Sequence, residues 1–208
     1  MQEVPLPAAV APVAVPVPTD GRTLRSLRTR EAIVDATIAL LEEGDLKPTA
    51  PRVAERASVS VRSVFQHFDD LESLHAAVAE RLATRLSALV LPISVDLPLD
   101  DRLARFVHQR GVLLDALAPI RRAADVHGPF STEITARLRD GQAFLRAEVE
   151  VTFAPELAAA GADREDLLDA LDATVSWGTW TTLRSAPGRD QASATRVMQR
   201  MAAAVLSS

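Results

Sequence analysis

The sequence predicts an all-α fold in which an N-terminal domain of three helices is followed by a larger helical domain. Alanine, leucine and arginine, which favour helices, dominate the chain after residue 21, and the alternation of apolar and polar residues typical of strands is scarce. Apolar residues instead recur every three or four positions, so that they share one face of a helix. A length of 208 residues is enough for two such domains with a shared core.

Composition and charge narrow the class of protein. The absence of cysteine excludes disulfides and thiolate zinc sites. No apolar run approaches the ~20 residues that span a bilayer, and the start of the chain lacks the basic segment of a signal peptide, so we expect a cytoplasmic protein with no membrane partner. The net charge is -5, yet four arginines follow one another without an acidic residue between them: Arg22, Arg25, Arg28 and Arg30. A basic segment on an acidic protein is typical of a DNA-binding end.

The first elements follow from composition and spacing. Residues 1–21, rich in proline, alanine and valine, are expected to form a disordered or extended tail. A helix over residues 26–43 places Ile33, Ala36 and Leu40 on one stripe, and Gly44 closes it.

Residues 49–68, TAPRVAERASVSVRSVFQHF, predict two short helices joined by a tight turn. Thr49 and Ser60 are good N-caps, so the first helix ends near residue 57 and the second runs over residues 61–68. Six apolar side chains can meet inside the corner: Val53, Ala54, Ala57, Val59, Val64 and Phe68. Four polar side chains are left facing outward: Arg62, Ser63, Gln66 and His67. This is helix-turn-helix geometry, in which the second helix enters the major groove of DNA.

The remaining helices form the larger domain. A linking helix starts near Asp70 and ends at Pro92, and the proline-bounded residues 92–99 connect it to the next element. Further helices are expected over residues 100–117, interrupted by Pro119, over 131–153, over 164–184 and over 190–206. The chain is thereby divided into a tail (1–21), a helix-turn-helix domain (22–69), a linking helix (70–91) and a ligand-binding and dimerisation domain (92–208).

The segment from Arg30 to Leu74 resembles the N-terminal domain of the TetR family of transcriptional repressors. The shared features are the apolar stripe of the first helix, Gly44, Thr49, the VAERA of residues 53–57, the following VS, an aromatic at Phe65, and His67-Phe68 before an acidic helix start. The resemblance covers about the first third of the folded chain. It implies a regulator whose partner is a double-stranded DNA operator.

Three positions depart from the pattern of the family. Ser58 stands where glycine is usual, Phe65 replaces a tyrosine that contacts phosphate, and Leu71 replaces a lysine that grips the DNA backbone. A slightly strained backbone is therefore expected at Ser58. Arg62 and Gln66, together with the upstream arginines, are expected to carry more of the binding.

The same residues predict how DNA is contacted. We expect Arg62, Ser63 and Gln66 to reach base edges and Val61 to touch a thymine methyl group. For Val61 and Ser63 the alternative is corner packing and helix capping, and for Arg62 it is plain solvent exposure. The surface also includes Phe65 and the residues expected to position the DNA backbone: Arg28, Arg30, Thr49 and His67.

The last two helices predict a homodimer. Leu168, Leu171 and Val175 lie on one side of the helix over residues 164–184, whereas Trp177 and Trp180 lie nearly opposite. Burial between the domain's own interior and a second subunit explains both faces. The resemblance implies a four-helix dimer bundle formed by about residues 164–206, to which the final helix contributes a stripe: Ala194, Val197, Met201 and Val205.

The resemblance also implies a small-molecule effector, which we expect to be largely apolar. Seven residues of the second domain are candidates for its site: Phe106, His108, His127, Phe130, Phe144, Trp177 and Trp180. Alternatively, these aromatics fill the core, or the tryptophans anchor the dimer interface.

Catalytic, metal and cofactor chemistry has no motif in the chain. The four histidines lack metal-ligand spacing, no serine lies in G-x-S-x-G, and no glycine-rich phosphate loop occurs. We therefore predict a homodimeric repressor that is not an enzyme, released from a palindromic operator by the effector. Two alternatives remain: a helical ligand-binding dimer with weakened or lost DNA binding, and a helical enzyme with an appended DNA-binding-like domain.

Overall fold

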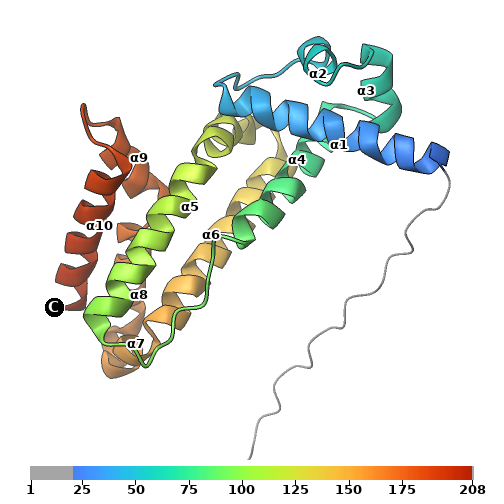
Figure 1. Ribbon diagram of the computed structural model, residues 1–208. Coiled ribbons are helices and arrows are strands. Elements are labelled where there is room, and N and C mark those ends of the chain that lie inside the picture. Colours follow the sequence, from blue (N-terminus) through green and yellow to red (C-terminus); the bar gives the residue numbers. More distant parts are fainter. Residues whose placement is uncertain (1–20, 208) are drawn as a thin grey trace, which may run out of the picture.

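The computed structural model describes residues 21–207, except for the side chain of Phe130, and this part of the chain consists of helices joined by turns and irregular loops (Figure 1). The all-α prediction is confirmed. The predicted tail lies outside the described residues apart from Gly21, which begins α1. No helix in the described range is long and apolar enough to cross a membrane. The elements are α1 (Gly21–Glu42), α2 (Ala50–Arg56), α3 (Val61–His67), α4 (Leu71–Ser87), α5 (Leu99–His127), η1 (Gly128–Phe130), α6 (Thr132–Thr152), α7 (Ala154–Ala159), η2 (Gly161–Asp163), α8 (Arg164–Thr174), α9 (Trp177–Ser185) and α10 (Gln191–Leu206).

Two hydrophobic cores organise the molecule. In Figure 1, α1, α2 and α3 lie together at one end, while α5 to α10 form the larger bundle. The first core lies among the helices α1, α2, α3 and α4. Its fully buried side chains include Ile33, Ile38, Val53, Val64 and Leu74. The second core lies among the helices from α5 through α10. It includes Val107, Leu114, Phe153, Leu171 and Trp180. Burial of each such large side chain stabilises the fold by about 1.5–3 kcal/mol.

Helix α5 connects the two cores. Phe106 in its first half is buried in the second core, whereas Ala123 near its end belongs to the first. The predicted helix end near Leu117 is wrong, because α5 continues through Pro119 to His127. A proline inside a helix removes one backbone hydrogen bond and costs about 3 kcal/mol. Packing of the last turns of α5 against the first core offsets that cost.

The single helix predicted over residues 164–184 is two helices. α8 ends at Thr174, and α9 begins after Ser176, whose hydroxyl accepts a hydrogen bond from a backbone N–H three residues later at 3.2 Å. The β-branched Thr174 and Val175, followed by a capping serine, explain the break. The break changes the direction of the later side chains, so that Val175 and Trp180 lie in the same core. The two apolar faces inferred from the sequence are therefore one buried surface.

The linking helix is shorter than predicted. α4 ends at Ser87, because the chain turns there towards α5, where the Gln109 side chain accepts a hydrogen bond from the backbone N–H of Leu91 at 2.9 Å. Arg102, only 2% exposed, holds the connector by donating to a backbone carbonyl of that connector at 2.5 Å and by pairing with Glu156. The buried Arg102 therefore attaches the start of α5 to helix α7.

Candidate nucleic-acid interface

A tight turn with two backbone hydrogen bonds joins α2 to α3. The N–H of Val59 donates to the carbonyl oxygen of Ala54 at 2.9 Å, and the N–H of Ser58 donates to that of Glu55 at 3.1 Å. Ser58 is left-handed, with φ at 56°, so the strain predicted there is confirmed. Val59 packs against the first core, as expected for the valine of the turn. These contacts fix the angle between the two helices.

Helix α3 has one buried and one exposed face. The Ser60 hydroxyl caps it as predicted, accepting a hydrogen bond from the backbone N–H of Ser63 at 3.0 Å. Val64 is buried in the first core, as is Phe68, the residue at the C-cap of α3. The outer face carries two apolar side chains, Val61 at 39% and Phe65 at 49% exposure, and two exposed polar ones, Arg62 and Gln66. Ser63 and His67 are half-buried at its edges.

Positive charge beside this face comes from α1 and α3 rather than from α2. The arginines of α2 form ion pairs with acidic residues just after α1: Arg52 with Asp45 at 3.1 Å, and Arg56 with Glu43 at 2.6 Å. Arg28 and Arg62 are exposed and form no ion pair with any residue that the structure describes. Unpaired exposed cations are the groups that DNA phosphates attract.

Arg30 and Thr49 have structural surroundings of their own. The Arg30 guanidinium lies over the Phe68 ring, 4.8 Å from its centroid, and this cation–π contact ties α1 to the end of α3. Thr49 occupies the N-cap position of α2 with an extended backbone, but its exposed side chain makes no capping hydrogen bond. Both residues lie on the elements that flank α3.

Two histidines lie where the first core meets the second domain. The rings of His75 on α4 and His127 at the end of α5 are 5.5 Å apart, and Nε2 of His127 is 3.0 Å from the carbonyl oxygen of Leu46. Burial lowers the pKa of His75, and the neighbouring His127 lowers it further, whereas Glu72 opposes the shift. His127, predicted as a ligand residue, therefore contacts the loop between α1 and α2.

The other predicted ligand residues are spread over the second domain. Phe106 and Trp180 are buried in the second core, and Trp177 is half-buried and donates from its indole nitrogen to Asp125 at 3.1 Å. His108 and Phe144 are exposed, and the side chain of Phe130 lies outside the described structure. The common location of Phe106 and Trp180 agrees with the alternative that these aromatics fill the core.

Two polar side chains inside the second domain, Arg110 and Asp172, were not among the predicted site residues. Arg110 is 3% exposed; its Nη2 donates to the carbonyl oxygen of Leu145 at 2.8 Å, and its Nη1 has no partner among the described residues. Asp172 accepts from Gln142 at 3.0 Å, while its buried Oδ1 is likewise unpaired in the described chain. Burial lowers the pKa of Arg110 to about 10, and Asp172 opposes this. Arg110 lies four positions after Phe106 on the buried stripe of α5, which is the signal that could have revealed it.

Helices α1, α2 and α3 together have the geometry of a helix-turn-helix, the class of domain that places an exposed helix in a DNA groove. No protein-family model and no curated protein matches the sequence. Solved structures match the fold. A protein described as a TetR-family transcriptional regulator from Mesorhizobium loti superposes with a TM-score of 0.65 and 19% identity over 88% of this chain and 97% of that chain.

Two further structures are equally similar. A transcriptional regulator from Rhodococcus sp. Rha1 has a TM-score of 0.65 and 19% identity over 88% of this chain and 96% of its own. A TetR transcription regulator from Haloarcula marismortui has the same score and identity over 86% of this chain and 96% of its own. The chain therefore has the fold of TetR-family regulators along most of its length, and the resemblance inferred from the first third of the chain is confirmed for the fold.

Proposed function

We propose that the protein is a DNA-binding transcriptional regulator, a homodimeric repressor that a small molecule releases from a palindromic operator. The exposed face of α3 carries this proposal. Arg62 and Gln66 extend from a helix whose opposite side is held by the buried Val64, so side chains able to read bases stand on a rigid support. The exposed Val61 and Phe65 add apolar groups of the kind that contact thymine methyls.

The proposed contacts divide into base reading and backbone positioning. Arg62 pairs with guanine and Gln66 with adenine, each with about 1–3 kcal/mol of discrimination against the wrong base, and Ser63 reaches a base edge beside them. The residues proposed to contact phosphates lie around α3: Arg28, Arg30, Thr49 and His67.

The test is a gel-shift assay with the DNA upstream of the protein's own gene. We expect sequence-specific retardation, and Arg62→Ala should weaken it by the equivalent of about 1–3 kcal/mol, or roughly 5- to 150-fold. Arg139→Ala is a matched control, because Arg139 is an exposed arginine on α6 of the second domain. Non-specific retardation alone, unchanged by Arg62→Ala or Gln66→Ala, would favour a ligand-binding dimer that has lost DNA recognition.

Salt dependence separates the two kinds of contact. Arg28→Ala should weaken binding to all sequences alike and reduce the slope of log K against log salt concentration by about 1, because one phosphate contact is lost. Gln66→Ala should leave the slope nearly unchanged and alter sequence preference. Equal slopes for wild type and Arg28→Ala would remove Arg28 from the interface.

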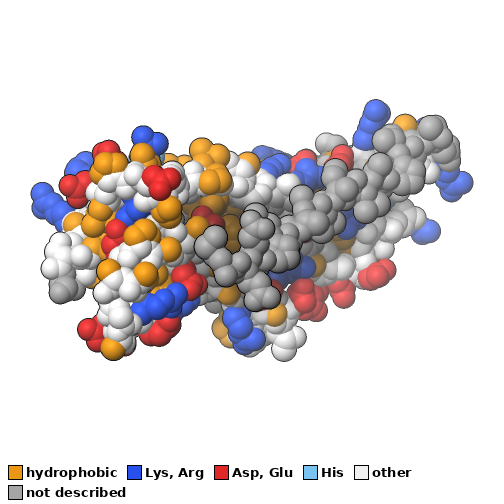
Figure 2. Space-filling model, turned by 90° about the horizontal axis from the view of Figure 1, so that it is seen from below, with side chains coloured by type: hydrophobic (Ala, Val, Ile, Leu, Met, Phe, Trp, Pro, Cys, Tyr) orange, Lys and Arg blue, Asp and Glu red, His pale blue; other side chains and the backbone are white. Residues whose placement is uncertain are grey.

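The dimer is proposed to form through α8, α9 and α10, about residues 164–206. Met201 on α10 is 40% exposed, and Val197 and Val205 beside it are half-buried, so an apolar strip borders the face that packs in the core. In Figure 2, hydrophobic side chains interspersed with charged ones lie over the end of the molecule formed by the larger bundle. In such a dimer, the two α3 helices are proposed to read two successive major grooves of a palindrome.

The effector is proposed to bind between α5, α6 and α8. The buried unpaired atoms of Arg110 and Asp172 suit a ligand with one acceptor and one donor beside the apolar ring of Phe106, 4.9 Å from the Arg110 guanidinium. The cavity lined by Phe106, Arg110 and Leu145 measures about 10 Å³, room for roughly one water. A ligand must therefore displace α5 from α6, and α5 carries Ala123 into the first core.

Release of DNA then follows from a shift of population. A ligand that prefers a different spacing of the two α3 helices lowers the fraction of dimers that fit successive grooves. A compound whose binding is lost in Arg110→Gln should weaken operator binding by wild type. A compound that binds the second domain and leaves operator affinity unchanged contradicts this mechanism.

A further inference from the structure

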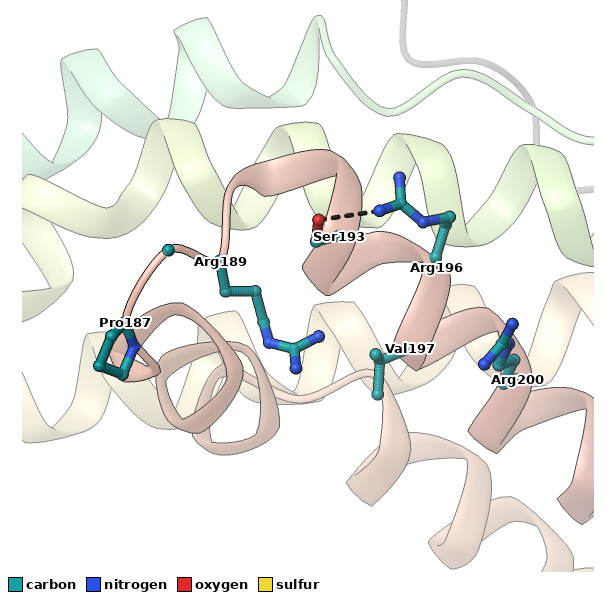
Figure 3. Close-up of a pocket in the computed structure, with 7 residues that line it drawn as sticks. Pro187, Arg189, Ser193, Arg196, Val197 and Arg200 are labelled. Carbon is teal, nitrogen blue, oxygen red and sulfur yellow. Dashed lines mark hydrogen bonds between the residues drawn. The ribbon is translucent and has the colours of Figure 1, made fainter.

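A hollow lined by arginines opens beside the loop between α9 and α10 (Figure 3). Its volume is about 310 Å³, at the lower end of the range for small-molecule sites. Its lining consists of Pro187, Gly188, Arg189, Ser193, Arg196, Val197 and Arg200, so no acidic residue is among the described residues that line it. Neither the proposed DNA interface nor the proposed effector site uses this place, but it borders the strip of α10 proposed to pair two copies, because Val197 belongs to both.

The charge of the hollow is only partly offset within the described chain. Arg189, Arg196 and Arg200 form no ion pair with any described residue. The nearby acids also have other partners: Asp190 accepts from the backbone N–H of Ser193 at 2.8 Å and caps α10, although its charge also attracts Arg196, and Asp115 pairs with Arg184 at 3.2 Å. Three arginines line this hollow and no acidic residue does, so an anion in it is favoured.

The loop and α10 hold these arginines in place. The guanidinium of Arg184 donates to the carbonyl oxygen of Arg189 at 2.8 Å, and Gly188 supplies the left-handed turn before it, with φ at 70°. In Figure 3 the Arg189 side chain extends from the loop towards Val197, while Arg196 is turned back to donate to the Ser193 hydroxyl at 2.8 Å. The buried Nε of Arg189 has no hydrogen-bond partner among the described residues.

We infer that this hollow binds a small anion with at least two negative charges, such as a phosphate ester or pyrophosphate. Arginine is suited to such groups because its planar guanidinium presents two parallel donors to two oxygens. Val197 and Pro187 supply apolar surface for an organic portion. The concave shape favours a small ligand over a DNA backbone, and α3 lies at the other end of the molecule (Figure 1).

Pyrophosphate binding to the full-length protein tests the inference. Isothermal titration and thermal unfolding are measured against sodium chloride of equal ionic strength, so that general screening is subtracted. With a Kd of about 1 mM, about 10 mM pyrophosphate should raise Tm by roughly 3–5 °C. The double variant Arg189→Gln/Arg200→Gln should bind at least about tenfold more weakly. Arg105→Gln/Arg139→Gln, at two exposed arginines outside the hollow, should bind like wild type.

Three results would overturn the inference. The first is the absence of saturable pyrophosphate binding by wild type up to about 10 mM. The second is equal binding by wild type and the Arg189→Gln/Arg200→Gln variant. The third is an Arg189→Gln/Arg200→Gln variant that becomes monomeric in sedimentation, because its weaker pyrophosphate binding would then follow from a lost contact with a second copy of the chain. If the double variant does not fold, Arg196→Gln alone replaces it.

Discussion

Ser58 is strained because it occupies the left-handed position that ends α2. The hydrogen bonds from the N–H groups of Ser58 and Val59 back to α2 require this conformation, and they set the angle at which α3 leaves the corner. A residue with a Cβ atom adopts it at a cost of about 1–2 kcal/mol. The turn between α2 and α3 therefore forms even though serine is not the most favourable residue at its left-handed position.

Replacing Ser58 by glycine should stabilise the protein. Because glycine adopts positive φ freely but loses more entropy on folding, we expect a net gain of about 0.5–1 kcal/mol, or a rise in Tm of roughly 1–4 °C. Thermal unfolding followed by circular dichroism measures the change. Ser58→Ala is the control, since it keeps a Cβ atom and should bring no gain. Equal Tm values for the two variants would mean that the backbone of the turn is not strained.

Helices α5 and α10 approach each other closely at Gly111. A Cβ atom added there would lie 2.6 Å from Oγ1 of Thr195 and 3.4 Å from the Trp180 ring. The Thr195 hydroxyl is itself fixed by a hydrogen bond to the carbonyl oxygen of Gln191 at 2.9 Å. The second core therefore depends on the absence of a side chain at this position.

Gly111→Ala should destabilise the protein although alanine is the better helix former. The overlap with Thr195 costs about 1–3 kcal/mol, which exceeds the helix-propensity gain of up to about 1 kcal/mol. Gly141→Ala in α6 is the matched control, because nothing lies within 4 Å of its added Cβ. Urea unfolding should therefore show opposite signs for the two substitutions. A stabilised Gly111→Ala variant would contradict the close packing of α5 on α10.

The contact between the two domains should be sensitive to pH through His75. Its pKa is lowered in the folded protein by burial and by His127, so below the ordinary value of 6.5 the unfolded chain binds protons that the folded chain does not. The free energy of unfolding should therefore fall as the pH drops from about 7.5 to about 5.5. Both His75 and His127 lie at the contact that joins α4 to the end of α5.

Urea unfolding of wild type and His75→Gln at several pH values measures this dependence. The variant should lose less stability than wild type on acidification, because it lacks the titrating group. His108→Gln, at an exposed histidine on α5, should behave like wild type. Parallel curves for wild type and His75→Gln would show that His75 does not control acid sensitivity.

Pairing of two molecules is expected to depend on Met201. A charge there would have to be buried in the proposed dimer, so Met201→Glu should give monomers in sedimentation and weaken operator binding by more than about tenfold. Ala192→Glu is the control: it lies nine residues earlier on α10, which places it on the opposite side of the helix. A dimeric Met201→Glu variant would locate the interface elsewhere.

Local signals predicted much of the N-terminal domain. Ser60 was recognised as a helix cap, and its side chain makes the capping hydrogen bond. The helix expected to start near Asp70 begins there, with the Asp70 side chain as its cap. Gly44, expected to close α1, has a φ of 91°. These features depend on residues within four positions of one another, which a linear pattern contains. The division of α3 into an inner and an outer face follows from the same periodicity.

The larger domain was predicted less well, because distant contacts determine it. Pro119 is a helix breaker by local rules, yet α5 continues past it since both of its ends are packed in cores. The break at residues 175–176 moved Trp177 and Trp180 out of the faces that a continuous helix would give them. The buried polar pair of Arg110 and Asp172 comes from helices far apart in the sequence.

The sequence of this chain is sufficient for its helical class, the Ser60 cap of α3 and the face of α3 proposed to read DNA, since each depends on neighbouring residues. Three-dimensional packing was needed to locate the continuity of α5, the two cores joined at His75 and His127, and the arginine hollow beside α10. The physical reason is that burial against a distant helix contributes several kcal/mol, which exceeds the roughly 1 kcal/mol preferences that local patterns record.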